Sequence, residues 1–363
     1  MLNYGVMNKQ AVQEAEFAPH LVSWQRQHGR HGLPWQCREP YKVWLSEIML
    51  QQTQVSTVLD YYPRFLAAFP DVQALAAADE DEVLGLWQGL GYYSRARNLH
   101  KAARQVISEF SGNFPHSRVG LQTLCGVGRS TAAAIAAFCF DARETILDGN
   151  VKRVLCRVFA LDGDIANKAF EDQLWRKAEA LLPLNAADMP AYIQGLMDLG
   201  ATVCKRSKPI CCSCPMNDLC QAYAQNRIAE LPRKKKAVSV KNLSLYWLVL
   251  RNCDGAIFLH KRPAKGIWGG LWCVPCADSL DDLYQLAAKF GCTAEDLTEG
   301  IEFSHRLTHR QLHILPFVAQ INTGQDAASS AITGEWVSAN NLNAYGIPKP
   351  LYDYLNVKQS SLF

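Results

Sequence analysis

Four cysteines in one short segment carry the strongest chemical signal of this sequence. Cys204, Cys211, Cys214 and Cys220 follow one another with the spacing C-x6-C-x2-C-x5-C. Four closely spaced thiolates are typical ligands of an iron–sulfur cluster or of a tetrahedral zinc ion, and this spacing differs from that of bacterial ferredoxins. The segment therefore predicts a metal centre, and the residues alone leave both metals open.

A turn with two glycines is the second signal. Gly126 and Gly128 stand one residue apart, shortly before an alanine-rich stretch with helical character. Two glycines permit a tight turn whose backbone N–H groups point outward at the start of the next helix, where they can bind an anion such as a DNA phosphate. An ordinary connection between two helices has the same pattern, so the turn alone does not establish DNA binding.

Two carboxylates stand out. Asp148 precedes a helical pattern over residues 151–159. Asp148 or Asn150 would cap that helix in the simplest interpretation; alternatively, Asp148 faces a sugar whose glycosidic bond is breaking. Glu47 lies in a helical pattern with no cationic residue three or four positions away. Apolar surroundings raise a carboxyl pKa, as a general acid requires, whereas an exposed or ion-paired glutamate is the alternative.

The periodicity of apolar residues divides the chain into a helical part and a part with strands. These elements must position the groups described above. Up to about residue 227, apolar residues recur every three or four positions, which is typical of helices. A basic stretch follows, and from residue 243 the pattern is that of strands. We expect strands at 243–251, 256–261, 313–319 and 335–337, with a hairpin turn at Asp254-Gly255 and a helix at 281–290. The prediction is an all-α N-terminal two-thirds and a smaller α+β domain.

Composition sets looser bounds. A chain of 363 residues is long enough for two or three domains, and a net charge of +3 neither demands nor excludes nucleic acid. The basic residues Arg95, Arg97, Lys101 and Arg104 would face solvent on a helix or follow phosphates. Four of the thirteen cysteines cluster, unlike a secreted disulfide framework. With no signal-peptide core and no apolar run of membrane-spanning length, we expect a cytoplasmic protein without a membrane partner.

Several motifs in order resemble the MutY-type adenine DNA glycosylases of the endonuclease III-like helix–hairpin–helix superfamily. The resemblance covers about residues 20–355. It is carried by the cysteine quartet and by LPWQ at 33–36, WLSEIMLQQTQV at 44–55, GLGYY at 89–93, LCGVGRS at 124–130 and ILDGNVKR at 146–153.

The resemblance implies a mostly α, two-lobed core with a Nudix-like α+β domain behind it. Residues 38–147 would form a six-helix barrel with the helix–hairpin–helix motif, and residues 1–37 and 148–230 the lobe with a 4Fe–4S cluster on the four cysteines. Residues 231–240 would be a basic linker, and 241–357 the lesion-recognition domain. Residues 281–291 of that domain lack the acidic set of a Nudix box, so we expect no pyrophosphate hydrolysis.

The resemblance also implies an activity: hydrolytic removal of adenine mispaired with 8-oxoguanine or guanine in double-stranded DNA, during base excision repair. Glu47 would protonate the adenine ring, and Asp148 would stabilise the positively charged sugar or briefly bond to it. Adenine is a poor leaving group as an anion, and an oxocarbenium-like sugar requires a nearby negative charge, so the chemistry agrees. The base must first leave the helix stack.

Other residues receive roles from the same resemblance. Tyr92, Ser130 and Asn150 would surround the sugar and flipped base, and Arg30 would line the base pocket. Gln52 would wedge into the stack, while Lys152 would reach the DNA backbone or remain a solvated lysine. The remaining candidates are the phosphate-binding Gly126 and Gly128, and a loop that inspects the base opposite adenine, Phe303, Ser304 and His305.

Ser130 discriminates between two kinds of glycosylase. Bifunctional relatives carry a lysine at this position, and a serine cannot form their Schiff base. We therefore expect a monofunctional glycosylase that leaves an abasic site, and a monomer as the default for this architecture. The alternatives are a lyase-competent endonuclease III relative and a non-catalytic iron–sulfur DNA-binding protein. Ser130 argues against the first, and the presence of both Glu47 and Asp148 against the second.

Overall fold

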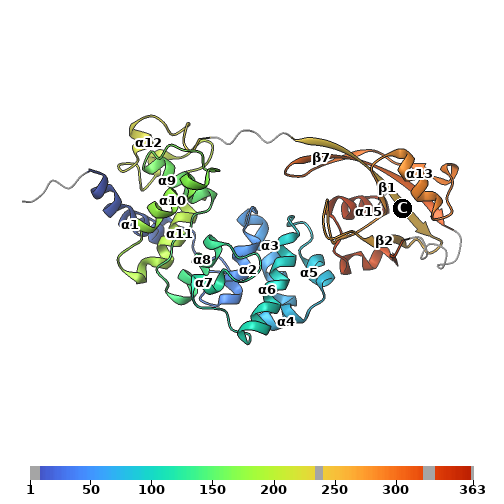
Figure 1. The fold of residues 1–363 in the computed structure, drawn as a ribbon, viewed down its shortest axis with the longest axis horizontal. Helices are drawn as coiled ribbons and strands as arrows, with labels where there is room; N and C mark the ends of the chain where they lie inside the picture. Colours follow the sequence, from blue (N-terminus) through green and yellow to red (C-terminus); the bar gives the residue numbers. More distant parts are fainter. Residues whose placement is uncertain (1–8, 234–239, 322–331, 361–363) are drawn as a thin grey trace, which may run out of the picture. The chain divides into compact units, whose positions relative to one another are not determined.

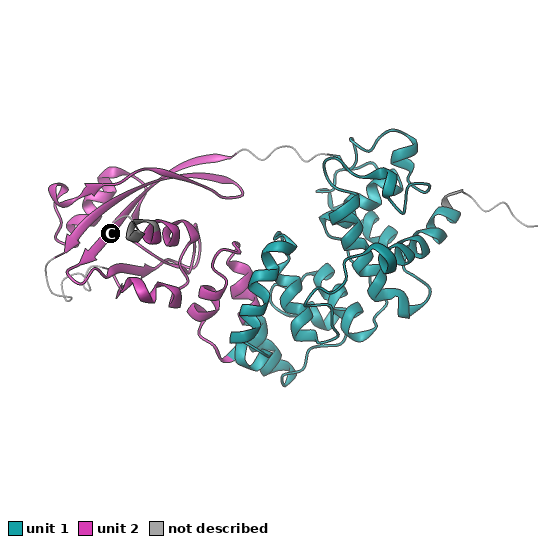
Figure 2. Ribbon diagram, turned by 180° about the vertical axis from the view of Figure 1, so that it is seen from behind, with its two compact units in different colours: residues 1–76, 101–236 teal, residues 77–100, 237–363 magenta. Residues whose placement is uncertain are grey.

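The computed structural model describes residues 9–233, 240–321 and 332–360, and it divides into two compact units. The first unit comprises Met1–Ala76 and Lys101–Lys236, and the second Ala77–His100 and Ala237–Phe363 (Figure 2). Residues 234–239, most of the predicted basic linker, lie outside the described residues. The predicted boundaries of the two helical lobes remain a prediction.

The first unit is helical in its described part, as predicted (Figure 1). Its long helices are α1 (Lys9–His28), α2 (Pro40–Met49), α3 (Val55–Ala68), α8 (Arg129–Phe140), α9 (Gly149–Val158), α10 (Lys168–Ala180) and α11 (Met189–Asp198). The shorter ones are α4 (Val72–Ala77), α7 (Arg118–Leu121), η1 (Ala186–Asp188), η2 (Leu199–Val203), η3 (Cys211–Ser213) and α12 (Gln221–Ala224). Helix α6 (Ser94–Phe110) continues from the second unit into the first. No helix among the described residues is long and apolar enough to cross a bilayer.

Helix α8 lies at the centre of the first unit. Residues 131–137 are all buried, and five of the seven are alanines. A helix that is buried all round must carry small side chains if its neighbours are to pack closely against it. Helix α8 is thus buried from Thr131 to Ala137, and its first turn carries Ser130.

The second unit contains a mixed sheet. The strands are β1 (Lys241–Asn252), β2 (Ile257–Lys261), β3 (Trp272–Cys273), β4 (Cys276–Ala277), β5 (Thr298–Glu299), β6 (Phe303–Arg306), β7 (Arg310–Ile321) and β8 (Glu335–Val337). The path is β3-β2-β1-β7-β5, with β1 and β7 parallel and the other pairs antiparallel. The four predicted strands and the Asp254-Gly255 turn are confirmed, whereas β3, β4, β5 and β6 were missed.

Helices cover both faces of this sheet. Leu245, Trp247 and Val249 of β1 pack in one core cluster, which includes residues of α15 (Lys349–Ser360). Leu248 and Leu250 pack in the other, with residues of α13 (Leu280–Ala288) (Figure 1). Side chains of a strand alternate between faces, so one strand contributes to both clusters. The predicted helix at 281–290 is α13, and the α+β class of this domain is confirmed. Two further short helices are η4 (Ala294–Asp296) and η5 (Ala339–Ala344).

The second unit also takes in a helical segment from the N-terminal half. This segment, residues 77–100, contains α5 (Glu80–Leu86) and the first turns of α6. Trp272 donates from Nε1 to Asp81 over 3.0 Å, and Arg97 donates to the carbonyl of Gly269 over 2.6 Å. These contacts hold the segment against the C-terminal domain.

Candidate active site and metal centre

Glu47 lies in the middle of α2, a helix that begins with Pro40 at a position that suits proline. Seven of its ten residues are buried, and Glu47 itself is half-buried. Burial, with a smaller contribution from the negative charge of Asp148, raises the pKa of Glu47 to about 8. Glu47 therefore holds a proton at neutral pH, as a general acid requires.

Asp148 is exposed and occupies the N-cap position of α9. Its Oδ1 accepts from the backbone N–H of Val151 over 2.8 Å, and its Oδ2 from the amide of Asn150 over 3.4 Å. The simple interpretation of Asp148 as a helix cap is thus correct. It does not exclude the other interpretation, because Asp148 also lines a cavity with Glu47.

This shared cavity of about 870 Å³ brings together six residues that the sequence singled out: Arg30, Glu47, Gln52, Ser130, Asp148 and Asn150. The Ser130 hydroxyl accepts from the backbone N–H of Leu147 over 2.6 Å, which fixes the chain one residue before Asp148. Gln52 is exposed and has a φ of 59°, an uncommon conformation for a residue other than glycine. Such outliers concentrate at functional sites.

A second cavity, of about 420 Å³, shares Glu47 and Arg30 with the first. Arg30 donates from Nε and from its backbone N–H to Asp198, over 2.7 and 2.9 Å. Asp198 is fully buried and also accepts from Gln194, which lines this cavity, over 2.8 Å. Sequence reasoning missed Asp198 and Gln194, because nothing in their local pattern on α11 distinguishes them from ordinary helix residues.

The turn before α8 has the predicted form. Gly126 has a φ of 77°, which favours glycine, whereas Gly128 is the N-cap of α8 with an ordinary φ of −82°. A Cβ on Gly128 would meet no atom within 4 Å, so the space beside this residue is open. No side chain in the described part of the chain caps α8, and its first N–H groups are therefore available to an anion.

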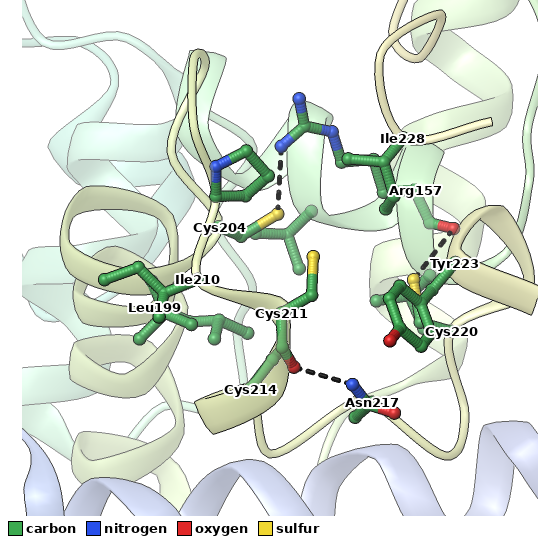
Figure 3. Close-up of a pocket in the computed structure, with 14 residues that line it drawn as sticks. Arg157, Leu199, Cys204, Ile210, Cys211, Cys214, Asn217, Cys220, Tyr223 and Ile228 are labelled. Carbon is green, nitrogen blue, oxygen red and sulfur yellow. Dashed lines mark hydrogen bonds between the residues drawn. The ribbon is translucent and has the colours of Figure 1, made fainter. Parts of the chain in front are cut away.

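The four cysteines line one cavity, which Figure 3 shows. Cys204 follows η2, Cys211 begins η3, and Cys220 is the N-cap of α12. Arg157 is buried beside them and donates to Cys204 Sγ over 3.5 Å and to the carbonyl of Lys205 over 2.7 Å. Sequence reasoning did not single out Arg157.

Four cysteine thiols beside a buried guanidinium form a donor set that fits an iron–sulfur cluster. Within the described residues, no three His, Cys, Asp or Glu side chains converge closely enough for one metal ion. A cluster binds each cysteine at a different iron atom and so accepts thiolates that lie further apart. Its net negative charge would also be matched by the buried guanidinium of Arg157, since hydrogen bonds to the sulfurs are part of such sites.

Arg153 connects the two sites through side-chain contacts. From α9 it donates to the carbonyl of Cys204 and to Oδ1 of Asn150, both over 2.8 Å, and to the carbonyl of Gly200 over 2.7 Å. Burial lowers the pKa of Arg153. Its neighbour Lys152 forms an ion pair with Glu171, so the lysine has a partner within the protein.

The remaining candidates lie in the second unit. Phe303 packs between Trp247 and Tyr354, and burial lowers the pKa of His305, while Ser304 is exposed. Tyr92 is 43% exposed and lines neither of the two cavities described for Glu47. Arg95, which we expected on a solvated helix face or along phosphates, is only 8% exposed; that expectation is wrong.

Comparison with known families defines the class of this protein. Residues 45–180 match the HhH-GPD superfamily of base excision DNA repair proteins, and residues 246–357 match the NUDIX domain family. A thermostable thymine-DNA glycosylase superposes with a TM-score of 0.54 and 27% identity over 60% of this chain and all of that structure. An endonuclease III–DNA complex shares the fold, with a TM-score of 0.51 and 20% identity, over 61% of this chain and 99% of that structure. The fold and site therefore define a helix–hairpin–helix DNA glycosylase.

Individual relatives narrow this class. The adenine DNA glycosylase of Buchnera aphidicola subsp. Baizongia pistaciae is 38% identical over 92% of this chain and 94% of the relative. The adenine DNA glycosylase of Mus musculus is 45% identical over 59% of this chain and 43% of the relative. The chain belongs to the adenine DNA glycosylase family, which confirms the resemblance stated from its motifs.

Proposed function

We propose that this protein removes adenine opposite 8-oxoguanine or guanine from double-stranded DNA by hydrolysis and leaves an abasic site. Family membership supports the choice of adenine. The observation that carries the chemistry is the shared cavity of Glu47 and Asp148, in which the pKa of Glu47 is raised to about 8. Glu47 then holds a proton, and Asp148 is the second, exposed carboxyl group of the same cavity.

In the proposed reaction, Glu47 donates its proton to a ring nitrogen of adenine. The bond between the sugar and the base breaks with both electrons leaving on the base, so the sugar develops positive charge. Asp148 stabilises this charge as a carboxylate; the oxygen of a water molecule then bonds to the sugar carbon while the water proton passes to the Glu47 carboxylate, which restores the acid. This is the two-carboxylate mechanism of glycoside hydrolysis applied to a nucleoside.

The flipped adenine would enter the smaller cavity, beside Glu47. Its wall includes Arg30, which Asp198 holds through two hydrogen bonds, and apolar side chains such as Trp35 and Phe138. A fixed guanidinium among apolar groups suits a flat heteroaromatic base, and the volume of about 420 Å³ lies in the range of small-molecule sites. Asn150 and Tyr92 are assigned to the sugar and base by the family resemblance.

Ser130 supports a monofunctional enzyme. It accepts a hydrogen bond from Leu147 in the larger cavity, where a bifunctional relative would carry its nucleophilic lysine. Lys152 lies two residues after Asn150 but is paired with Glu171. The proposed product is therefore an uncut strand with an abasic site.

Cys204, Cys211, Cys214 and Cys220 would hold a 4Fe–4S cluster, which supplies bonds that order the chain between them. The chain itself fixes this loop to α9, because Arg157 donates to the carbonyls of Lys205, Arg206 and Leu231 over 2.7, 3.3 and 2.8 Å. The loop would thus be ordered where it meets the DNA backbone.

The other assignments follow the same proposal. Gly126 and Gly128 would bind a phosphate through the start of α8, and Gln52 would wedge into the base stack. Residues 303–305 would read the base opposite adenine. Lys152, although it is paired with Glu171, could contact a DNA phosphate. We further propose that residues 1–37 and 148–230 form one lobe and residues 38–147 the other. Residues 231–240 would be a linker and residues 241–357 a separate domain, and the enzyme would be monomeric and cytoplasmic.

The purified protein and a duplex with one adenine opposite 8-oxoguanine test this function. We expect strand breakage at the adenine only after hot alkali, because alkali cleaves the abasic site that the enzyme leaves. Breakage without alkali would contradict the role of Ser130, and intact strands under both conditions would contradict the glycosylase activity. A Glu16→Gln variant, which alters an exposed carboxyl group of α1, should behave as the wild type, whereas Glu47→Gln should bind the duplex without releasing adenine.

A further inference from the structure

Two cysteines of the C-terminal domain lie in contact with each other, outside the sites described above. Cys273 ends β3 and Cys276 begins β4, both are free thiols, and their Sγ atoms are 3.8 Å apart. The Cys276 thiol also donates to the carbonyl of Val274 over 3.0 Å, which fixes the position of its sulfur. Two sulfurs in a disulfide are about 2.0 Å apart, so a short approach of the two side chains would join them.

The sheet holds the backbone on both sides of this pair. Cys273 lies opposite a residue of β2, and Cys276 lies opposite Trp247 of β1. Between the two cysteines, the carbonyl of Pro275 accepts from the N–H of Leu248 over 2.9 Å. The two thiols are therefore kept together in the reduced state, and a reaction between them needs little further ordering of the chain.

The two thiols differ in exposure and in acidity. Cys273 is fully buried, and burial raises its pKa. Cys276 is partly exposed, and the hydrogen bond that Cys273 donates lowers its pKa, with a further contribution from the positive charge of Arg262. Arg262 is itself held in place, because its Nε donates to the carbonyl of Ile267 over 3.0 Å. Since the thiolate is the nucleophile, Cys276 is the thiol that reacts first with an oxidant.

We propose that Cys273 and Cys276 are a redox couple that a peroxide closes to a disulfide. The Cys276 thiolate attacks one oxygen of hydrogen peroxide, the O–O bond breaks, and the released hydroxide becomes water with the proton that the thiol gave up. The Cys273 sulfur then attacks the sulfenic sulfur of Cys276, and the hydroxyl group leaves as water with the Cys273 proton. The two sulfurs are oxidised and the peroxide is reduced to two water molecules. A small cellular thiol restores both cysteines by exchange.

The couple would protect the domain from irreversible oxidation. Cys276 packs against the core cluster that contains Trp247 and Val249 of β1. A sulfinic or sulfonic acid at Cys276 would bring a charged group to these buried apolar side chains, which is unfavourable. A neighbouring thiol consumes the sulfenic acid before this happens. The disulfide would close a short loop, which stabilises a fold less than a long one, so a redox role suits the pair better than a structural one.

Peptide mapping of the full-length protein tests the couple. The protein is treated with hydrogen peroxide, its remaining thiols are alkylated, and it is digested. We expect the peptide with Cys273 and Cys276 to lose two hydrogens and both alkylation sites, and to regain both sites after dithiothreitol. Cys276→Ser should abolish this linked peptide, whereas Cys253→Ser, which removes an exposed thiol of the same domain, should leave its yield unchanged. A wild type in which Cys253 is oxidised while Cys273 and Cys276 remain alkylated would overturn the proposal.

Cys273→Ala tests the order of events and the protection. Alanine keeps the buried position apolar but removes the second thiol. We expect dimedone to trap a sulfenic acid at Cys276 in this variant, and further peroxide to give an acid that dithiothreitol does not reverse. The wild type should recover both thiols under the same conditions. If the wild type loses Cys276 irreversibly as readily as the variant does, the protective role is wrong. Neither readout uses adenine release, so the result is independent of the proposed function.

Discussion

The proposed reaction gives the two carboxyl groups of one cavity opposite tasks, and the surroundings of the two groups differ. Glu47 is half-buried on a mostly buried helix, and burial raises its pKa to about 8. Asp148 is exposed and accepts hydrogen bonds from the N–H of Val151 and the amide of Asn150, which are the partners a carboxylate prefers. The same pair of side chains could not act as acid and anion if both were equally buried.

Asp148→Asn separates the structural role of this residue from its catalytic role. Asparagine caps helices about as well as aspartate, so the free energy of unfolding should change little. The negative charge is lost, and we expect the single-turnover rate of adenine release to fall roughly a hundredfold or more. Asp164→Asn is a matched control, because Asp164 also accepts from a backbone N–H but is assigned no catalytic role. A variant of Asp148 that kept the wild-type rate would show that its charge is not needed.

At the scale of elements, α9 joins the two sites. It begins at the cap formed by Asp148, and it carries Arg153 and Arg157 toward the cysteine loop. Gly200 lies against this helix so closely that a Cβ there would approach Cβ of Asn150 to 2.6 Å. Helix α9 is therefore packed and hydrogen-bonded beside both the cysteine loop and the cavity of Glu47 and Asp148.

Arg153→Gln should disturb both ends of this helix. The change removes donors to Cys204, Gly200 and Asn150, and their acceptor atoms lose a charged partner. We expect a loss of about 2 kcal/mol or more in the free energy of unfolding, measured by denaturant titration. Lys152→Gln, on the same helix, should cost about 1 kcal/mol or less, because its ion pair with Glu171 is partly exposed. Equal losses in the two variants would contradict the linking role of Arg153.

At the scale of the whole molecule, the order of element types was predictable from periodicity. The alanine-rich stretch became the buried helix α8, and the alternating residues of β1 reached both faces of the sheet. Strands β3, β4 and β5 contain two residues each, which is too short for any periodic signal. The fold class could therefore be predicted, but not the full strand order.

The site was predictable only where its chemistry is local. The cysteine spacing and the two-glycine turn are short patterns; the four cysteines line one cavity, and Gly126 has a positive φ. Arg30 and Asp198 are 168 positions apart, and no local pattern could pair them. The prediction for Arg95 is wrong for the same reason. The helix pattern indicates a solvated face, whereas the folded loop 89–93 covers the Arg95 side chain. Long-range partners are properties of the fold.

The single-turnover rate of adenine release, measured against pH on a duplex with adenine opposite 8-oxoguanine, tests the central claim most directly. If Glu47 must be protonated, the rate should fall as pH rises through the pKa of about 8, by about tenfold per pH unit beyond it. Glu16→Gln should show the same profile as the wild type. A rate that stays constant through this range would contradict Glu47 as the acid, and a rate that already falls near the ordinary carboxyl value of 4.5 would contradict its raised pKa.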